Sequence, residues 1–519
     1  MMKLYYMPRR ISLIITDGWG IAKPGPGNYV SQAKTPNSNN LLKRYPHTSL
    51  KASGNSVGLP KKTQGNSEVG HLHLGAGRIV WQMYEKINRK IRNKNFFKNK
   101  PLLNAMKFAK KHNTSLHLMG LCSDEGVHAH IDHLIALLKM AKNQKLKNVF
   151  IHFFCDGRDV PEKSAKKYVK IIERAEKKIG IGKIGTVVGR YYSMDRDKNW
   201  NRTKKAYDML VFGKGFEAKS AKDAIEKAYE RGDKTDYYIQ PTVIVDKNGG
   251  ALTTIKDKDS VIFFNFRTDR PRQLTETFIS KKFKKFKRKF WPNVLFTTMT
   301  EYDKEFNCPF AFEEEMVKDN LGEILAKNKL KQLRLAETEK YAHVTYFFNS
   351  QIETPNKGED RVMIPSPKVP SYDLKPEMSA YKIAKEAVRQ ISNKKYDFIL
   401  MNFANCDLVG HSAVKKAIIK CVEVVDDCMG KVVRACMEND YISIITADHG
   451  SAEDKLYPDG RPKPAHSTNP VNFIIVSNDE RLKKIRLVKG GLKNVAPTIL
   501  DLMNIKKPKK MTGKSLIIH

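Results

Sequence analysis

The sequence lacks long apolar runs and a recognisable export signal. No segment reaches the roughly 18 uninterrupted apolar residues of a membrane span, so we expect no membrane partner. Residues 1–18 contain a basic pair, but their apolar run leads straight to Asp17 without a small-residue cleavage site. We therefore interpret this segment as a short extension before a first strand, not as a signal peptide, and expect a cytoplasmic protein.

Paired cysteines are also missing. The seven cysteines are odd in number, scattered and without a CxxC pair; they are Cys122, Cys155, Cys308, Cys406, Cys421, Cys428 and Cys436. This pattern argues against a disulfide framework and against a structural zinc knuckle. We expect most of these residues to be buried as small hydrophobic side chains in a reducing compartment.

Acidic residues are scarce relative to basic ones. The chain has 94 Lys and Arg against 55 Asp and Glu, a formal net charge of +39 spread over its whole length. Such a charge is compatible with nucleic-acid binding, with steering of anionic substrates, or with a solvated lysine-rich surface. Because no zinc-finger, RNP-type or bZIP pattern accompanies it, we expect no specific nucleic-acid partner and favour weak, salt-sensitive adsorption.

What the sequence does contain is an alternation of strands and helices over 519 residues, a length that favours two domains. Amphipathic helical stretches lie between many of the short β-branched runs, which predicts an α/β fold with largely parallel sheets. The predicted strands are 11–16, 115–121, 148–154, 183–189, 260–266, 398–403, 441–446 and 471–476. The basic stretch 281–289 is expected to be a solvated helix face or loop.

Residues of metal-binding type gather near the two ends of the chain. Several follow predicted strands directly, where open α/β sheets bind ligands; the set is Asp17, Ser67, Asp407, His411, Asp448, His449 and His466. Since they come from 17–67 and from 407–466, the N-terminal segment is expected to pack with the C-terminal half and the middle to form an insertion. Mixed oxygen and nitrogen ligands suit Mn²⁺, with Mg²⁺, Zn²⁺ or Co²⁺ as competitors.

Ser67, in GNSEVG, has two interpretations. It could be a metal-activated nucleophile for phosphoryl transfer, and it could also be the N-cap of a following helix; the two roles are compatible. A helix N-terminus at this place would also favour an incoming phosphate.

The middle of the chain carries a second set of residues, suited to a small anion. Arginine binds carboxylate and phosphate in bidentate fashion, and several of these arginines follow predicted strands in Gly- or Asp-rich loops. The set is His128, Arg158, Asp159, Arg190, Arg196, Arg267 and Arg270.

Long blocks of the sequence resemble the family of cofactor-independent phosphoglycerate mutases. They appear in the family's order and are DGWG, GNSEVGHLHLGAGR, GVHAH, DGRD, GRYYSMDRD, NFRTDR, AETEKYAHVTYFFN, PSPKVPSYDLKPEMSA, NFANCDLVGH, TADHG and HSTNPV. TADHG and the D-x₃-H spacing belong more broadly to the alkaline phosphatase superfamily. Ser451, Ala413 and the His73-Leu74 pair depart from the usual family pattern, but none is a proposed ligand.

The resemblance implies an α/β fold in which an alkaline-phosphatase-like three-layer α/β/α domain (1–80 and 316–519) carries an inserted, smaller α/β transferase domain (81–315). It implies two Mn²⁺ ions, one held by Asp407, His411 and His466. The other would be held by Asp17, Ser67, Asp448 and His449. His128, Arg158, Asp159, Arg190, Arg196, Arg267 and Arg270 would bind substrate, and Lys340 in ETEKY would reach the phosphate.

The implied activity is interconversion of 3-phosphoglycerate and 2-phosphoglycerate by a monomer, without a bisphosphoglycerate cofactor. Ser67 would carry the phosphoryl group, and Asp159 would handle the hydroxyl proton. A related phosphatase or phosphopentomutase is the alternative enzyme, and the arginine-rich blocks argue against it. A nucleic-acid-binding or scaffold role is the alternative outside enzymes.

Overall fold

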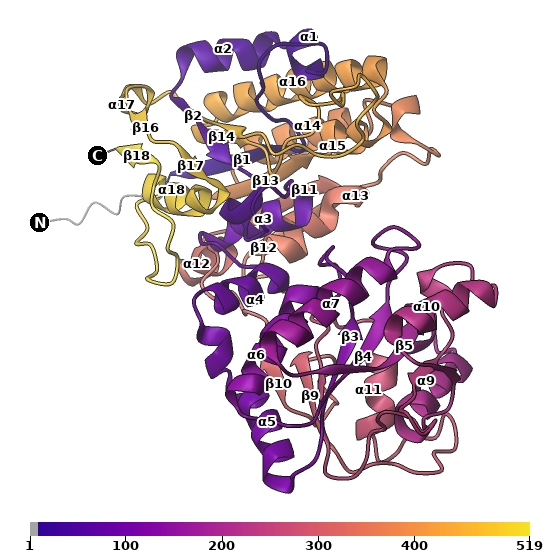
Figure 1. Ribbon diagram of the computed structural model, residues 1–519. Helices are drawn as coiled ribbons and strands as arrows, with labels where there is room; N and C mark the ends of the chain where they lie inside the picture. Colours follow the sequence, from indigo (N-terminus) through magenta and orange to yellow (C-terminus); the bar gives the residue numbers. More distant parts are fainter. Residues whose placement is uncertain (1–8, 519) are drawn as a thin grey trace, which may run out of the picture. The chain divides into compact units, whose positions relative to one another are not determined.

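The computed structural model describes residues 9–518, which divide into two compact units (Figure 1). One unit combines the chain up to Gln82 with the chain from Glu315 onward, and the other is Met83–Glu314. Each unit is built around its own eight-stranded sheet and its own hydrophobic core.

The sheet of the first unit joins strands from both ends of the chain. Its order is β12 (Glu359–Ile364), β11 (Gln332–Glu337), β13 (Phe398–Phe403), β1 (Arg10–Thr16), β14 (Tyr441–Thr446), β15 (Val471–Val476), β2 (His47–Lys51) and β17 (Gly490–Gly491). The five strands from β12 to β14 run parallel, whereas β15 is antiparallel to both of its neighbours. Strands β13 and β14 are buried at every position, as expected where helices cover both faces of a parallel sheet.

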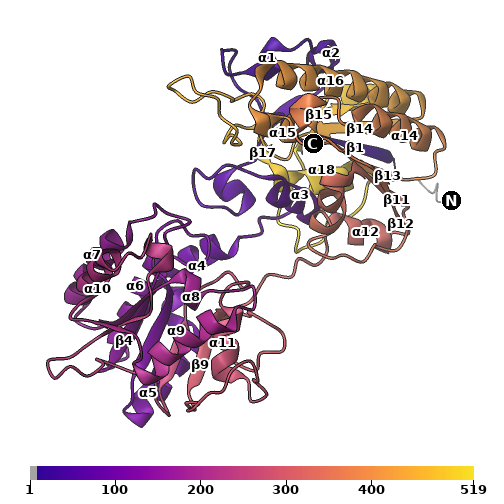
Figure 2. The ribbon, with the colours of Figure 1, turned by 90° about the vertical axis from the view of Figure 1, so that its right-hand side faces the viewer.

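Helices cover both faces of this sheet, so the unit has three layers (Figures 1 and 2). One face carries α2 (Pro36–Arg44), α14 (Ala380–Ser392) and the long α16 (Lys415–Glu438). The other carries α3 (Ser67–Ala76), α12 (Leu321–Lys327) and α18 (Val495–Leu502). The short elements of the unit are α1 (Tyr29–Gln32), α13 (Thr338–Ala342), α15 (Asn405–Leu408), α17 (Glu480–Lys483), β16 (Arg486–Leu487) and β18 (Ile517–Ile518).

The second unit is also a doubly covered sheet. Its order is β10 (Phe310–Phe312), β9 (Leu295–Thr300), β8 (Ser260–Phe263), β3 (Leu116–Leu121), β4 (Val149–Cys155), β5 (Lys183–Gly189), β7 (Thr242–Ile244) and β6 (Phe216–Ala218), with only β5 and β7 antiparallel among these neighbours. Helices α5 (Lys100–His112), α6 (Ile131–Asn143) and α7 (Ala165–Ile179) lie on one face, and α9 (Trp200–Phe212) and α11 (Arg272–Ile279) on the other (Figure 2). The remaining helices are α4 (Met83–Arg92), α8 (Arg190–Ser193) and α10 (Ala221–Glu230).

The predicted α/β class with largely parallel sheets is confirmed, and each of the eight predicted strands corresponds to a strand within a few residues. The basic stretch 281–289 forms a loop rather than a helix. Among residues 9–518, no helix is both long enough and apolar enough to cross a membrane.

Candidate functional site

Three neighbouring parallel strands bring three aspartates to one edge of the first sheet. Asp17 directly follows β1, Asp407 lies in α15 just after β13, and Asp448 lies two residues beyond β14. The carboxyl ends of parallel strands meet at the same edge, which explains why residues far apart in sequence converge here. All three side chains are almost completely buried.

Ser67 is the first residue of helix α3, and its hydroxyl faces this edge. Asn66 is the N-cap, because its side chain accepts a hydrogen bond from the Val69 amide; the interpretation of Ser67 as the N-cap is therefore wrong. Because Asn66 caps the helix, the Ser67 hydroxyl is available to interact with the other residues at this edge. It donates to Asp17 Oδ1 at 3.3 Å and lies 3.1 Å from His449 Nε2.

Lys340 brings a positive charge to the same hydroxyl. It lies in α13, directly after β11, and its Nζ donates to Ser67 Oγ at 2.5 Å and to Asp407 Oδ2 at 2.6 Å. The same nitrogen is 3.0 Å from Asp17 Oδ2. Burial alone would lower the pKa of Lys340, but the carboxylates around it raise that pKa above its usual value. The lysine is therefore charged.

Asp407 lies at the centre of a cluster of imidazoles. Its Oδ1 lies 2.9 Å from His466 Nε2, 3.3 Å from His411 Nε2 and 3.8 Å from His449 Nε2. Within the described part of the chain this oxygen accepts no geometrically sound hydrogen bond, although it is buried. The His411 and His466 Nε2 atoms also lie 3.1 Å from each other. Several lone-pair donors pointing at one another are the arrangement that a cation would satisfy.

A second group forms around Asp448 and includes a histidine that the sequence prediction missed. His71 Nδ1 lies 3.2 Å from Asp448 Oδ2, and Asn402 Nδ2 donates to Asp17 Oδ2 at 2.8 Å. His71 is four residues after Ser67 on the same helix, so the i, i+4 spacing placed it on the same face. That spacing was the signal that could have identified it.

The donor set fits divalent metal ions. Ligand atoms of Asp407, His449 and His466 lie within 4.8 Å of one another, and so do those of Asp17, His71 and Asp448. Burial would lower the pKa of His449, but Asp448, Asp17 and Asp407 raise it to about 10, which shows how negative the surroundings are. Carboxylate oxygen and imidazole nitrogen together suit Mn²⁺, Co²⁺ and Zn²⁺. The structure thus brings together all seven residues of the predicted metal set.

The second unit contains the predicted anion-binding residues. Carboxylates hold several of these side chains in place through ion pairs. Arg190, the first residue of α8 after β5, is buried and donates through Nη1 to Asp156 Oδ1 and Asp159 Oδ2, both at 2.6 Å. Asp156 also accepts hydrogen bonds from the backbone amides of Arg158 and Asp159. The prediction did not include Asp156, although its place directly after β4 was a signal.

Asp269 pairs with the arginines on the other side of this cluster, and the sequence analysis did not predict it. Its Oδ2 accepts from Arg196 Nη1 at 2.5 Å, and its Oδ1 lies 3.1 Å from Arg267 Nε. His128 lies between the two groups, 3.7 Å from Asp269 Oδ1 and 3.9 Å from Asp159 Oδ2. Burial and then the charge of Arg190 lower the pKa of His128 to about 3, so this imidazole is neutral.

Arg270 and Arg158 complete the cluster. Burial and the neighbouring guanidinium groups lower the pKa of Arg270, and Arg158 is among those neighbours. The Arg158 side chain is exposed, and within residues 9–518 no carboxylate forms an ion pair with it. All seven predicted substrate residues of this unit therefore lie in one region, with a surplus of guanidinium charge.

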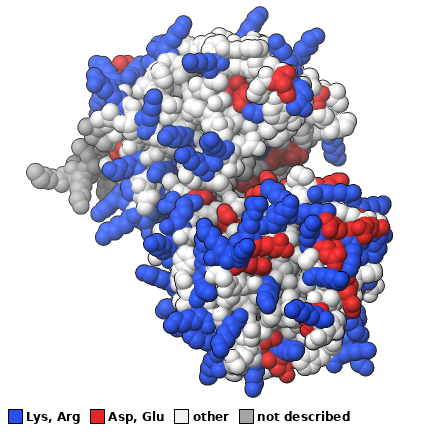
Figure 3. Space-filling model, viewed as in Figure 1, with Lys and Arg blue, Asp and Glu red and all other residues white. Residues whose placement is uncertain are grey.

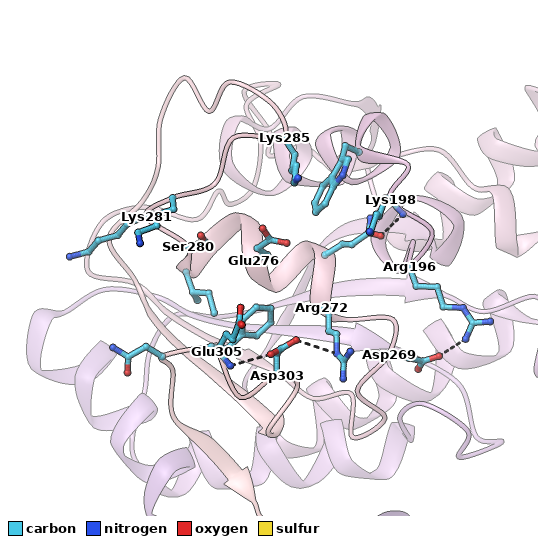
Figure 4. A pocket seen from close by; sticks show the side chains of 16 residues that line it. Arg196, Lys198, Asp269, Arg272, Glu276, Ser280, Lys281, Lys285, Asp303 and Glu305 are labelled. Atoms are coloured by element: carbon cyan, nitrogen blue, oxygen red, sulfur yellow. Dashed lines mark hydrogen bonds and ion pairs between the residues drawn. The ribbon is translucent and has the colours of Figure 1, made fainter.

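A large open cleft adjoins the cluster through Arg196 and Asp269 (Figure 4). Its volume is about 1080 Å³, and its walls mix lysines, arginines and carboxylates such as Glu276 and Asp303. Lysine and arginine side chains are spread widely over the face shown in Figure 3 rather than gathered into one stripe. This distribution agrees with a solvated basic surface.

The chain is similar to known proteins along nearly its whole length. A family model described as BPG-independent PGAM N-terminus matches residues 87–304. A 2,3-bisphosphoglycerate-independent phosphoglycerate mutase of Clostridium botulinum is 51% identical over 510 residues, covering 98% of this chain and 99% of the relative. A similarly named protein of Methanosarcina acetivorans is 51% identical over 512 residues, covering 98% and 99%. A crystal structure of Leishmania mexicana phosphoglycerate mutase at low cobalt concentration is 30% identical, covers 99% of this chain and 98% of that one, and has a TM-score of 0.63.

Proposed function

We propose that this chain, which belongs to the family of 2,3-bisphosphoglycerate-independent phosphoglycerate mutases, interconverts 3-phosphoglycerate and 2-phosphoglycerate through a phosphoserine on Ser67. The observation that carries the phosphoserine is the setting of the Ser67 hydroxyl. It lies at the start of a helix, within hydrogen-bond distance of Asp17, His449 and Lys340. A serine hydroxyl is a weak nucleophile unless neighbouring groups stabilise its alkoxide, and here a lysine and metal-type ligands surround it.

The cofactors in this proposal are two Mn²⁺ ions, with Mg²⁺, Co²⁺ or Zn²⁺ as competitors and no bisphosphoglycerate. Asp407, His411 and His466 would hold one ion. Asp17, Ser67, Asp448 and His449 would hold the other, with His71 as an additional candidate suggested by its distance to Asp448. When bound, such ions lower the pKa of a coordinated hydroxyl and neutralise charge on phosphoryl oxygens.

In the proposed reaction, the phosphoryl group moves from the substrate to Ser67 and back. Ser67 Oγ gives up its proton and forms a bond to phosphorus as the bond from phosphorus to one glycerate oxygen breaks and that oxygen takes up a proton. Lys340 donates hydrogen bonds that stabilise charge on the serine and phosphoryl oxygens. The released glycerate keeps its carboxylate, which the arginine cluster is suited to bind in bidentate fashion. Its other hydroxyl then takes the phosphoryl group from Ser67 and loses its proton, for which Asp159 is the proposed acceptor, while the released Ser67 Oγ takes up a proton.

The proposed setting is the cytoplasm, where the reaction would serve glycolysis and gluconeogenesis. The protein would act as a monomer on 2- and 3-phosphoglycerate, without a specific nucleic-acid partner. A reducing compartment suits its seven free cysteines, most of which are buried.

The test is the variant Ser67→Ala, assayed by coupling to enolase without added bisphosphoglycerate. We expect mutase activity to fall by at least about 10³-fold, with no phosphoprotein detectable by intact mass after incubation with substrate. Release of free phosphate by the unmodified protein, in place of mutase turnover, would identify a phosphatase. Retained turnover in the variant would refute the covalent route.

A further inference from the structure

A buried lysine that the proposed mechanism does not use connects the loops of the metal-type ligands. Lys455 is completely buried, in the segment that follows Asp448-His449. Its Nζ donates to the Gly410 carbonyl at 3.2 Å, to the Ala465 carbonyl at 3.1 Å and to Ser451 Oγ at 2.9 Å. A lysine ammonium has three N–H donors, and here all three are used.

Each acceptor lies next to a proposed metal ligand. Gly410 directly precedes His411, Ala465 directly precedes His466, and Ser451 follows His449 by two residues. Gly410 lies 45 residues before Lys455 in the chain, whereas Ser451 and Ala465 lie only four and ten residues from it. His411 Nδ1 also lies 3.1 Å from the Pro464 carbonyl oxygen, so the Lys455 ammonium strengthens an existing connection between the two segments. One ammonium group thus joins the loop after β13, which carries Asp407 and His411, to the loop between β14 and β15, which carries His449 and His466.

Lys455 is itself held firmly in place. Its backbone amide donates to the Gly27 carbonyl and its own carbonyl accepts from the Lys463 amide, both at 2.9 Å. Two residues earlier, the buried Glu453 accepts hydrogen bonds from the Gly20 and Ser451 amides at 3.0 and 2.8 Å. The Glu453 carboxylate compensates part of the buried lysine charge and secures the loop that follows Asp17.

Glycines make these close approaches possible. A Cβ on Gly410 would lie 2.8 Å from Ser451 Oγ, and a Cβ on Gly20 would lie 2.4 Å from the Glu453 carboxyl carbon. Both spacings are shorter than side chains tolerate. The loops therefore pack around the Glu453 and Lys455 head groups rather than merely passing near them.

From this geometry we propose that Lys455, with Ser451 as its side-chain acceptor, is a positioning residue for the metal ion held by Asp407, His411 and His466. Hydrogen-bond partners behind metal ligands set ligand orientation, and their loss typically costs about 10- to 100-fold in metal affinity. The inference rests on the proposed two-metal function. It also gives a contact to Ser451, one of the departures from the family pattern noted above.

The test titrates metal-free Lys455→Met and metal-free unmodified protein with Co²⁺. Binding is measured by calorimetry and by visible absorption. We expect unmodified protein to bind two ions, and Lys455→Met to bind one of them about 10- to 100-fold more weakly with a changed absorption spectrum. The affinity for the other ion should change less than about threefold. Lys382→Met, the same change at an exposed position of α14, is the matched control and should leave both affinities unchanged.

Two further variants separate positioning from plain stabilisation. Lys455→Gln keeps N–H donors without the charge and should restore part of the lost affinity, and Ser451→Ala removes one acceptor and should give a smaller loss of a few fold. The second variant also serves if Lys455→Met does not fold. Unchanged Co²⁺ affinity and spectrum in Lys455→Met or Ser451→Ala, even with a lower melting temperature of the metal-free protein, would overturn the inference. If unmodified protein bound no metal at all, the proposed function would fail first.

Discussion

The candidate sites of the two units carry an excess of opposite charge. In the first, three buried carboxylates (Asp17, Asp407 and Asp448) share a single lysine, Lys340, so negative charge and lone pairs remain in excess. In the second, five arginines meet three carboxylates (Asp156, Asp159 and Asp269), so positive charge remains in excess. Both units contain largely parallel α/β sheets, and the charged residues of each cluster lie mostly in the loops and short helices that follow the strands. The first is suited to cations and the second to an anion such as a carboxylate.

Removal of metal should give the largest difference between the two units, because we expect it to affect only the first. Chelation with EDTA is expected to lower mutase activity by about 10³-fold or more, because the excess carboxylates beside the proposed nucleophile Ser67 would lose the proposed metal ions. Hydrogen exchange should accelerate in the loops around 407–411 and 448–466, with the second unit unchanged. Activity that resists chelation, or loss of protection in Met83–Glu314, would contradict the division of charge between the units.

Arg190→Met tests how much the buried ion pairs of the second unit contribute to stability. Arg190 is buried and paired with two carboxylates, and removing one partner of a buried ion pair costs about 3–5 kcal/mol of stability. Urea unfolding measures this cost. Arg196→Met is the matched control, since its half-exposed pair with Asp269 contributes about 0–1 kcal/mol. Equal losses in the two variants would show that burial does not distinguish them.

Arg158→Ala should have a smaller and purely functional effect. The side chain is exposed and forms no ion pair within the described residues, so stability should change by less than about 0.5 kcal/mol. If it binds substrate, KM should rise about 10-fold while kcat changes little. Steady-state kinetics at two salt concentrations check this. A fall in kcat alone would place Arg158 in the chemistry rather than in binding.

The smallest effect concerns His128. Its pKa is lowered to about 3 by burial and by Arg190, so NMR should show no titration of this imidazole between about pH 5 and pH 8. Its folded pKa lies below the unfolded value near 6.5, so the unfolded chain takes up the proton first. The contribution of His128 therefore makes stability fall as pH drops below about 6.5. A His128 resonance that titrates near pH 6.5 would contradict this.

The strands and the types of ligand could be predicted from sequence, but not every partner could. Asp17, Asp407 and Asp448 follow strands whose β-branched runs are local signals. His71, Asp156 and Asp269 were not predicted, although their spacings from predicted site residues contained the information. Lys340 was predicted only through family resemblance, because one lysine among many carries no local signal.

The sequence by itself determined the α/β class, the strand-end placement of the aspartates and the residue types that gather in the two clusters. These depend on hydrophobic periodicity and residue type, which act over a few neighbouring residues. Only the tertiary structure decided that Asn66, and not Ser67, caps α3, and that Lys340 and Lys455 are buried against different parts of one site. The physical reason is that burial of a charge depends on partners that only the folded chain brings close, such as Ser67 for Lys340, 273 residues away, and Gly410 for Lys455, 45 residues away.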